Sequence, residues 1–177
     1  MLYETTHTKN HFFSISEYST PPYNFSWIVE GCLAGMACPS NTSEIRYLVE
    51  NGIGHLVTLS KDRIPPMDDD SIRNHIKWTV IPVVEFEPPT LDDMKKFIAI
   101  CKEHQGKSAV GVHCRMGRGR TGVMLACYLV RFHGLSPDKA ITEVRLKRPG
   151  SIETYQQEVA VKTYHDFLRS TAYKTDS

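Results

Sequence analysis

A cysteine and an arginine that stand six positions apart are the residues of this chain best suited to chemistry. Cys114 and Arg120 enclose the residues Arg-Met-Gly-Arg-Gly, and the apolar run 108–112 before them is typical of a buried strand. The apolar run 123–130 after them is typical of a buried helix. Backbone N–H groups in a loop between strand and helix converge on an anion, and the helix dipole adds positive charge. The segment is therefore predicted to hold a phosphate above a cysteine.

Cys114 is the predicted nucleophile of this loop. Cysteines at helix N-termini and beside arginine have pKa values of roughly 3.5–7.5 instead of about 8.5, so the thiolate is present at neutral pH. Arg120 is predicted to bind two phosphate oxygens through its planar guanidinium. Thr121 is predicted to donate its hydroxyl to the sulfur, which eases departure of the thiolate when a phosphocysteine breaks down. The predicted phosphate-binding residues are Arg115, Met116, Gly117, Arg118, Gly119 and Arg120.

Other interpretations of the loop agree less well with its residues. A Walker nucleotide loop ends in Gly-Lys-Ser/Thr, whereas Gly122 is followed by Val123. A Cys-His protease pair is excluded because His113 and Cys114 are consecutive at a strand end, where successive side chains point to opposite faces. His113 is predicted instead to orient the loop by hydrogen bonds. A zinc site is not predicted, since the five cysteines stand singly.

The segment from His113 to Gly122 resembles the motif of the cysteine-dependent protein tyrosine phosphatases, which is Cys-x5-Arg followed by Ser or Thr. The segments 24–35, 126–130 and 148–155 resemble small atypical dual-specificity phosphatases, and the resemblance covers residues 22 to 168. It implies the protein tyrosine phosphatase fold, a phosphocysteine intermediate and no metal or other cofactor. It also implies a carboxylic acid, usually an aspartate from a loop before the nucleophile strand, that protonates the leaving oxygen.

The loop that supplies this acid departs from the family pattern. After Ile81-Pro82, where relatives place an aspartate, the chain reads Val-Val-Glu-Phe-Glu-Pro-Pro. Glu85 precedes a phenylalanine, as the family's aspartate does, with a shift of two residues, and is the predicted general acid. Asp92 is the alternative, although it falls in the first turn of a predicted helix, where carboxylates commonly stabilise the helix dipole. Catalysis without an efficient acid is the third alternative.

Glu153 is another carboxylate with a predicted supporting role. The segment 151–154 resembles a loop that lies beside the active site in these small phosphatases, where a glutamate positions the hydrolytic water. The same residues also fit ordinary capping at the start of a helix. Both interpretations of Glu153 are open from the sequence.

The substrate is predicted to be a phosphoprotein. The chain lacks the Asn-Arg-Tyr loop with which tyrosine-specific phosphatases build a deep slot, and the segment 61–71 is short and polar. A shallow site accepts phosphotyrosine as well as phosphoserine and phosphothreonine. Arg115 and Arg118 keep a phosphoinositide substrate open, because phosphoinositide phosphatases carry paired lysines at these places. An RNA 5′-phosphate and a non-catalytic phosphate-binding module are further alternatives.

Composition adds a few constraints. A chain of 177 residues with 41% hydrophobic residues suits one domain, and a net charge of +1 predicts no stable association with nucleic acid or membrane. Five cysteines without framework spacing predict a reducing location, cytoplasmic with the nucleus as second choice. Cys101 and Cys127 are predicted to pack as small hydrophobic residues. No targeting segment is recognised, and the protein is predicted to be a monomer.

Strand and helix patterns alternate along the chain, which predicts an α/β domain with a mostly parallel sheet of about four or five strands flanked by helices. Predicted strands are 27–33, 55–59, 76–83 and 108–112, and predicted helices are 42–51, 90–104, 120–130, 136–145 and one that starts at residue 151. In the last helix Tyr155, Val159 and Phe167 are predicted to face inward. Residues 1–20 are predicted to be a flexible N-terminal extension, 21–169 the catalytic domain and 170–177 a C-terminal tail.

Overall fold

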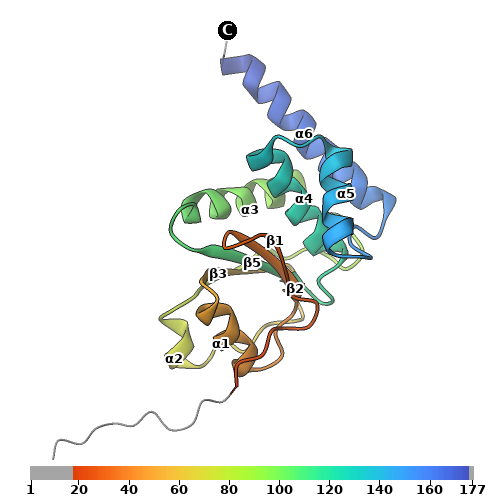
Figure 1. The fold of residues 1–177 in the computed structure, drawn as a ribbon. Helices are drawn as coiled ribbons and strands as arrows, with labels where there is room; N and C mark the ends of the chain where they lie inside the picture. Colours follow the sequence, from red (N-terminus) through yellow and green to blue (C-terminus); the bar gives the residue numbers. More distant parts are fainter. Residues whose placement is uncertain (1–17, 176–177) are drawn as a thin grey trace, which may run out of the picture.

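The computed structural model describes residues 18–175, and its centre is a five-stranded sheet (Figure 1). The strands lie in the order β1-β2-β5-β3-β4. β5 pairs in parallel with β2 on one side and with β3 on the other, β3 pairs in parallel with β4, and β1 runs antiparallel to β2. The bounds are β1 Ser26–Val29, β2 Leu33–Ala37, β3 Ile53–Thr58, β4 Lys77–Val80 and β5 Ala109–Cys114. The predicted α/β class and the mostly parallel sheet are confirmed.

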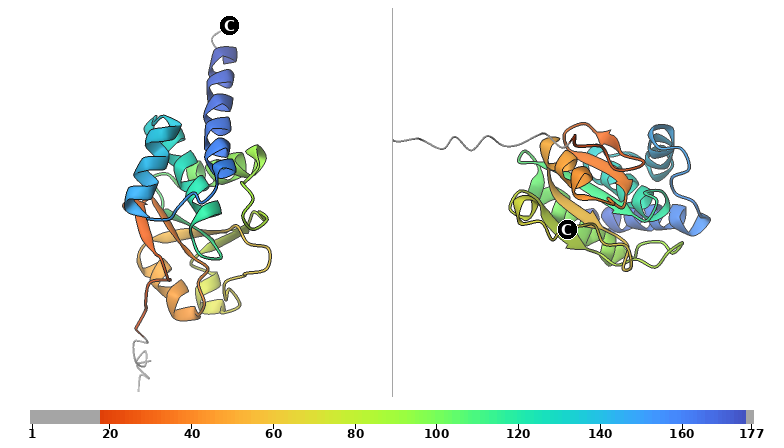
Figure 2. Two further views of the ribbon diagram at one scale, coloured as in Figure 1. Left: turned by 90° about the vertical axis from the view of Figure 1, so that its right-hand side faces the viewer. Right: turned by 90° about the horizontal axis from the view of Figure 1, so that it is seen from below.

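Helices cover both faces of the sheet (Figures 1 and 2). Parallel strands need crossover connections, and helices in those connections bury the central strand on both sides. In Figure 1, α1 (Thr42–Glu50) and the short α2 (Asp70–Arg73) lie below the sheet, and four helices lie above it. These are α3 Leu91–His104, α4 Gly119–His133, α5 Pro137–Lys147 and α6 Tyr155–Thr175. The C-terminal part of α6 projects beyond the other helices in Figure 1 and in the left view of Figure 2.

α4 is enclosed by its neighbours. Its residues from Gly119 to Val130 are all buried, because α3, α5 and α6 pack around it and the sheet lies beneath it. Met124 and Leu125, from its apolar run, are 0% exposed. Burial of one aliphatic side chain of this size contributes about 1.5–3 kcal/mol. This packing holds the start of α4 firmly at the carboxyl end of β5.

The first predicted strand is wrong, because residues 27–33 form a hairpin rather than one strand. β1 ends at Val29, β2 begins at Leu33, and Gly31 turns the chain with φ +64°. Glycine adopts this left-handed conformation at little cost because it has no Cβ. Apolar residues lie on both sides of the turn, so their pattern alone did not show it. The hairpin places β2 directly beside the nucleophile strand β5.

The last helix starts later than predicted, at Tyr155, and part of its predicted inward face is wrong. Thr154 caps it, since its hydroxyl accepts a hydrogen bond from the Gln157 N–H at 3.2 Å. Tyr155 and Val159 are exposed, whereas Phe167 is partly buried against the core as predicted. The buried residues of this helix include Gln157, Ala160, Val161 and Tyr164. The prediction followed the larger apolar side chains, but the packing of α6 against α4 decides which face turns inward.

Two other helix starts agree with the prediction. Thr90 caps α3 in a capping box with Asp93, and Pro137 occupies the first turn of α5 after Ser136. The domain limits stay a prediction. α6 continues through residue 175, and residues 1–17 and 176–177 of the predicted extension and tail lie outside the described residues.

Candidate active site

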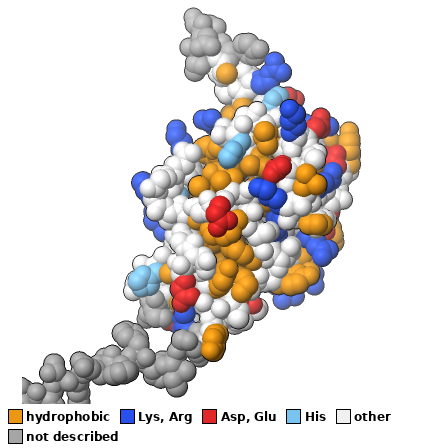
Figure 3. Space-filling model, viewed as in Figure 1, with side chains coloured by type: hydrophobic (Ala, Val, Ile, Leu, Met, Phe, Trp, Pro, Cys, Tyr) orange, Lys and Arg blue, Asp and Glu red, His pale blue; other side chains and the backbone are white. Residues whose placement is uncertain are grey.

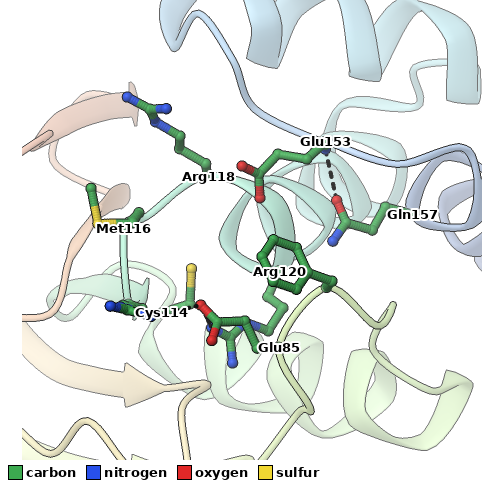
Figure 4. A pocket seen from close by; sticks show the side chains of 9 residues that line it. Glu85, Cys114, Met116, Arg118, Arg120, Glu153 and Gln157 are labelled. Carbon is green, nitrogen blue, oxygen red and sulfur yellow. Dashed lines mark hydrogen bonds and ion pairs between the residues drawn. The ribbon is translucent and has the colours of Figure 1, made fainter.

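The predicted nucleophile lies at the carboxyl end of the central strand. Cys114 ends β5, α4 begins at Gly119, and the loop between them lines a cavity of about 320 Å³. Cys114 is 3% exposed, so only a group that enters the cavity reaches its sulfur. The cavity brings three separate segments of the chain together around the thiol (Figure 4). Its lining residues are Glu85, Phe86, Cys114, Arg115, Met116, Arg118, Arg120, Glu153 and Gln157.

The shape of the loop depends on Gly117. Its φ is +70°, in the left-handed region that favours glycine. A Cβ at this position would lie 2.3 Å from the backbone oxygen of Met36, which cannot easily move aside. Gly119 has a different use: a Cβ there would lie 2.5 Å from the Glu153 carboxylate, so its absence lets that side chain approach the loop. The backbone contact therefore requires glycine at position 117, whereas at position 119 a side chain would displace the ends of Glu153 and Gln157.

Two residues without a predicted role hold the loop from behind. Arg148 is buried and donates from Nη2 to the Gly117 carbonyl at 2.6 Å and from Nη1 to the Gly35 carbonyl at 2.7 Å. Asn24 donates from Nδ2 to the Met116 carbonyl at 3.0 Å. Burial lowers the pKa of Arg148 to about 10, so its guanidinium stays charged at neutral pH. Because loop carbonyls are bonded from this side, the loop N–H groups are left to bind an anion.

Arg120 extends from the first turn of α4 and is 5% exposed. Its Nη1 donates to the Val83 carbonyl at 2.9 Å, which fixes the plane of the guanidinium. The other edge of the fork, Nε and Nη2, suits two oxygens of one phosphate. The predicted bidentate contact has the orientation that it needs, and the role of Arg120 stays a prediction.

His113 lies in a chain of hydrogen bonds beneath the loop. The indole Nε1 of Trp78 donates to Thr58 Oγ1 at 2.8 Å, and Thr58 Oγ1 lies 2.7 Å from His113 Nε2. The Cys114 carbonyl can only accept, so His113 Nδ1–H donates to it at 3.2 Å, and Nε2 of the neutral ring accepts the hydroxyl proton of Thr58. Burial lowers the pKa of His113 to about 4, which agrees with this neutral tautomer. His113 thus orients the backbone of the nucleophile without adding a charge.

Glu85 lines the cavity and Asp92 does not. Glu85 and Cys114 line the same cavity (Figure 4), and Glu85 Oε1 lies 3.9 Å from Arg120 Nη2. Asp92 is in the first turn of α3, where its side chain is 77% exposed and pairs with Lys95 at 3.0 Å. The position of Asp92 agrees with the dipole-stabilising alternative. The geometry favours Glu85 as the general acid, and this assignment stays a prediction.

Glu153 and Gln157 reach over the cavity from the start of α6 (Figure 4). Gln157 Oε1 accepts hydrogen bonds from the Glu153 N–H at 2.7 Å and from the Thr154 N–H at 3.4 Å. Gln157 is 0% exposed, and its Nε2 has no hydrogen-bond partner among the described residues. Thr154 therefore provides the capping, while the Glu153 side chain lines the cavity. Gln157 was not predicted, because its inward position depends on where α6 begins.

The other predicted residues of the loop face the cavity in different ways. Thr121 is 0% exposed, and its hydroxyl has no hydrogen-bond partner within residues 18–175, so the predicted donation to the sulfur is not made in this structure. Arg115 and Met116 are exposed at the rim. The Arg118 guanidinium points away from the Cys114 sulfur in Figure 4. Arg120 and the loop backbone are therefore the groups best placed for the transferred phosphate.

Features outside the cavity add little to its chemistry. Cys101 and Cys127 are buried as predicted, and burial raises the pKa of both thiols. Across the described part of the chain, no three His, Cys, Asp or Glu side chains form a cluster suited to a metal ion. None of the helices in residues 18–175 is long and apolar enough to cross a membrane. On the face seen in Figure 3, Lys and Arg side chains are scattered rather than gathered into one patch.

The chain is similar in sequence to known phosphatases. The family model described as Swiss Army Knife protein, DSP-PTPase phosphatase domain (PTP-SAK) matches residues 22–161. Protein tyrosine phosphatase domain-containing protein 1 of Bos taurus is 30% identical over 165 residues, which cover 81% of this chain and 20% of that protein. Dual specificity protein phosphatase CDC14A of Mus musculus is 27% identical over 149 residues, which cover 76% of this chain and 24% of that protein.

A solved structure of Tk-PTP in the active form is similar to this chain with a TM-score of 0.70 and 26% identity, over 81% of this chain and 97% of that one. The chain spans 20% to 24% of the length of the two curated relatives above. The family match contains the whole Cys114 loop as well as Glu85, Glu153 and Gln157. On this basis the chain is a cysteine-based phosphatase domain of the protein tyrosine phosphatase type, and it belongs to the PTP-SAK dual-specificity phosphatase family.

Proposed function

We propose that this chain is a metal-independent phosphatase that hydrolyses phosphotyrosine, phosphoserine and phosphothreonine in proteins through a phosphocysteine. The observation that carries the proposal is the grouping of the Cys114 thiol, the Arg120 guanidinium and the Glu85 carboxyl group in one cavity. In the first step the Cys114 sulfur bonds to phosphorus and the bond to the leaving oxygen breaks. Arg120 and the loop N–H groups stabilise the phosphoryl oxygens, and Glu85 gives its proton to the leaving oxygen.

The second step uses the residues that cover the cavity. Water attacks phosphorus, the sulfur–phosphorus bond breaks, inorganic phosphate leaves and the thiolate is restored. The attacking water must lose a proton, and the Glu85 carboxylate, now deprotonated, accepts it. Gln157 Nε2 is a buried donor without a partner among the described residues, so it can hold the water oxygen by donation, while Glu153 accepts the water's other proton in a hydrogen bond.

The rim of the cavity supports a protein substrate. Phe86 is 67% exposed and Met116 is 45% exposed, so the entrance has apolar side chains that can contact a polypeptide. A phosphoinositide would be bound through extra cations of the loop, yet the Arg118 guanidinium points away from the Cys114 sulfur. Among atypical dual-specificity phosphatases, we propose dual specificity protein phosphatase 23 as a near relative, on the likeness of segments 24–35 and 148–155. We further propose a monomer in the cytoplasm, with the nucleus as second choice.

A panel of substrates tests the proposed function with the full chain. We expect release of inorganic phosphate from a phosphotyrosyl and a phosphoseryl peptide, with kcat/KM at least about tenfold above that for a water-soluble phosphoinositide or a 5′-triphosphorylated RNA. EDTA should leave the rates unchanged, because every group in the proposed steps belongs to the protein. Faster hydrolysis of the phosphoinositide or the RNA would overturn the protein-substrate proposal, and binding without any hydrolysis would favour a phosphate-binding module.

The variant Gln157→Glu tests the water-positioning role. It keeps an oxygen that accepts from the Glu153 and Thr154 N–H groups, replaces the donor Nε2 by an oxygen that cannot donate, and adds a negative charge at this buried position. We expect breakdown of the phosphocysteine to slow by about tenfold or more, the effect of losing one hydrogen bond to a charged group. Rapid mixing with p-nitrophenyl phosphate should then show a burst of p-nitrophenol equal to the enzyme concentration. As the matched control, Gln156→Glu changes the exposed neighbour and should show no new burst.

A further inference from the structure

A second groove adjoins the catalytic cavity. It has a volume of about 720 Å³ and is lined by the loop after β3, the segment after β2 and the start of the nucleophile loop. Arg115 and Met116 line both the groove and the cavity, so the two hollows share a wall. Arg115 directly follows Cys114 in the chain. A substrate whose phosphate lies over the sulfur therefore presents its neighbouring groups to this groove.

The backbone on both sides of the groove is tied to the end of β2. The Cys38 thiol donates to the Arg63 carbonyl at 3.6 Å, and the Cys38 N–H donates to the Arg115 carbonyl at 3.3 Å. Pro65 and Pro66 follow in the Arg63 loop, and their rings fix φ and reduce the number of conformations the loop can adopt. Pro65 is also buried. The backbone at both arginines is thus held by hydrogen bonds to Cys38.

The charge of the groove is unbalanced. Arg63 has no carboxylate within ion-pair distance among the described side chains of residues 18–175. Arg115 forms one ion pair, with Glu85 at 3.6 Å; the pair is half-exposed, and Glu85 also lies near Arg120. Asp68 is the one acidic residue in this groove as the structure describes it. The apolar groove beside α6, lined by Pro88 and Tyr155, has no charged lining residue within the same described range. The hollow that shares Glu85 and Arg120 with the cavity matches Lys61 and Arg120 with Asp62 and Glu85. The Arg63 groove, with two arginines and one aspartate, therefore suits an anion better.

We propose that the Arg63 groove binds a second anionic group of the substrate, on a residue adjacent to the phosphorylated one. This inference rests on the proposed function and makes the substrate class narrower: a phosphopeptide with an acidic side chain or a second phosphate beside the target residue. An extended peptide advances at most about 3.6 Å per residue, so side chains of nearby residues reach adjoining hollows. Arg63 and Arg115 supply forked donors that fit a carboxylate or a phosphate.

Matched peptides test this proposal. The full chain is assayed for kcat/KM on phosphotyrosyl peptides that differ only in Asp, Asn or phosphoserine at the position next to the phosphotyrosine. We expect the wild type to prefer Asp over Asn by about fivefold to tenfold, mainly through KM, with phosphoserine at least equal to Asp. Arg63→Ala should bring the ratio of Asp to Asn near one, and Arg63→Glu should invert it. Arg131→Ala removes an exposed arginine at the far end of α4 and should keep the ratio of the wild type.

The result that overturns the proposal is an Asp to Asn ratio that Arg63→Ala and Arg63→Glu leave unchanged. Equal hydrolysis of all three peptides by the wild type would do the same while leaving the proposed protein phosphatase activity intact. If the enzyme hydrolysed p-nitrophenyl phosphate but none of the peptides, both the proposed protein phosphatase function and the proposed role of the groove would be overturned. If Arg63→Ala lowered kcat/KM only for a water-soluble phosphoinositide, the groove would be assigned to a lipid headgroup instead. Because the readout is a ratio, a partly unfolded variant does not imitate the expected result.

Discussion

Replacement of Cys114 by serine is expected to reduce phosphate release by roughly 10⁴-fold or more, the loss typical of removing a catalytic nucleophile. A serine hydroxyl is protonated at neutral pH, and among the described residues no side-chain base is hydrogen-bonded to the Cys114 side chain. The neighbouring His113 turns its Nδ1–H to the Cys114 carbonyl instead. The loop N–H groups and Arg120 remain in Cys114→Ser, so tungstate, a phosphate analogue, should still bind. Hydrolysis of p-nitrophenyl phosphate and tungstate titration by calorimetry measure the two effects separately.

Cys32→Ser is the matched control for the nucleophile, because Cys32 is exposed in the hairpin turn and does not line the cavity. It should retain the activity of the wild type. Turnover by Cys114→Ser at a rate near the wild type would disprove the phosphocysteine mechanism. Loss of both hydrolysis and tungstate binding would show instead that the serine disturbs the loop itself.

Glu85→Gln is expected to lower kcat by about 10²–10⁴ for substrates with poor leaving groups, the usual contribution of general acid catalysis. Glutamine has nearly the same shape as glutamate, but its amide is too weak an acid to transfer a proton to the leaving oxygen. A leaving group of low pKa departs without protonation, so the defect should shrink from phenyl phosphate to p-nitrophenyl phosphate. A plot of log kcat against leaving-group pKa, measured for wild type and variant, tests this dependence, and the decline of the rate at high pH should weaken in the variant.

Asp92→Asn is the control for this assignment, because Asp92 is exposed, pairs with Lys95 and lies outside the cavity lining. It should have the leaving-group dependence of the wild type. If Asp92→Asn instead showed the steep dependence while Glu85→Gln did not, the acid would lie at the start of α3. If neither variant differed from the wild type, the enzyme would work without an efficient acid.

The predicted nucleophile and the predicted phosphate-binding arginine are close together in the sequence, so local patterns were enough to single them out. Cys114 and Arg120 lie in one contiguous loop, and the apolar runs on either side predict the strand and the helix that position it. The cap of α3 at Thr90 could also be predicted from the sequence, because a capping hydrogen bond joins residues only three positions apart. The choice of Glu85 as acid came from a family pattern, and its approach to Arg120 became visible only in the structure.

Contacts between distant segments required the tertiary structure. Arg148 and Gln157 were missed because arginine and glutamine are mostly exposed in proteins, and nothing local shows that either will be buried. Arg148 meets Gly117 only after the hairpin of β1 and β2 has been placed beside β5, and Gln157 faces the cavity only because α6 begins at Tyr155 and packs against α4. The sequence by itself thus determined the α/β class and was enough to predict the nucleophile and the phosphate loop, since these follow from local spacing. The order of the strands and the rotation of α6 decided which remote side chains complete the site, because burial and pairing depend on the packing of the whole chain.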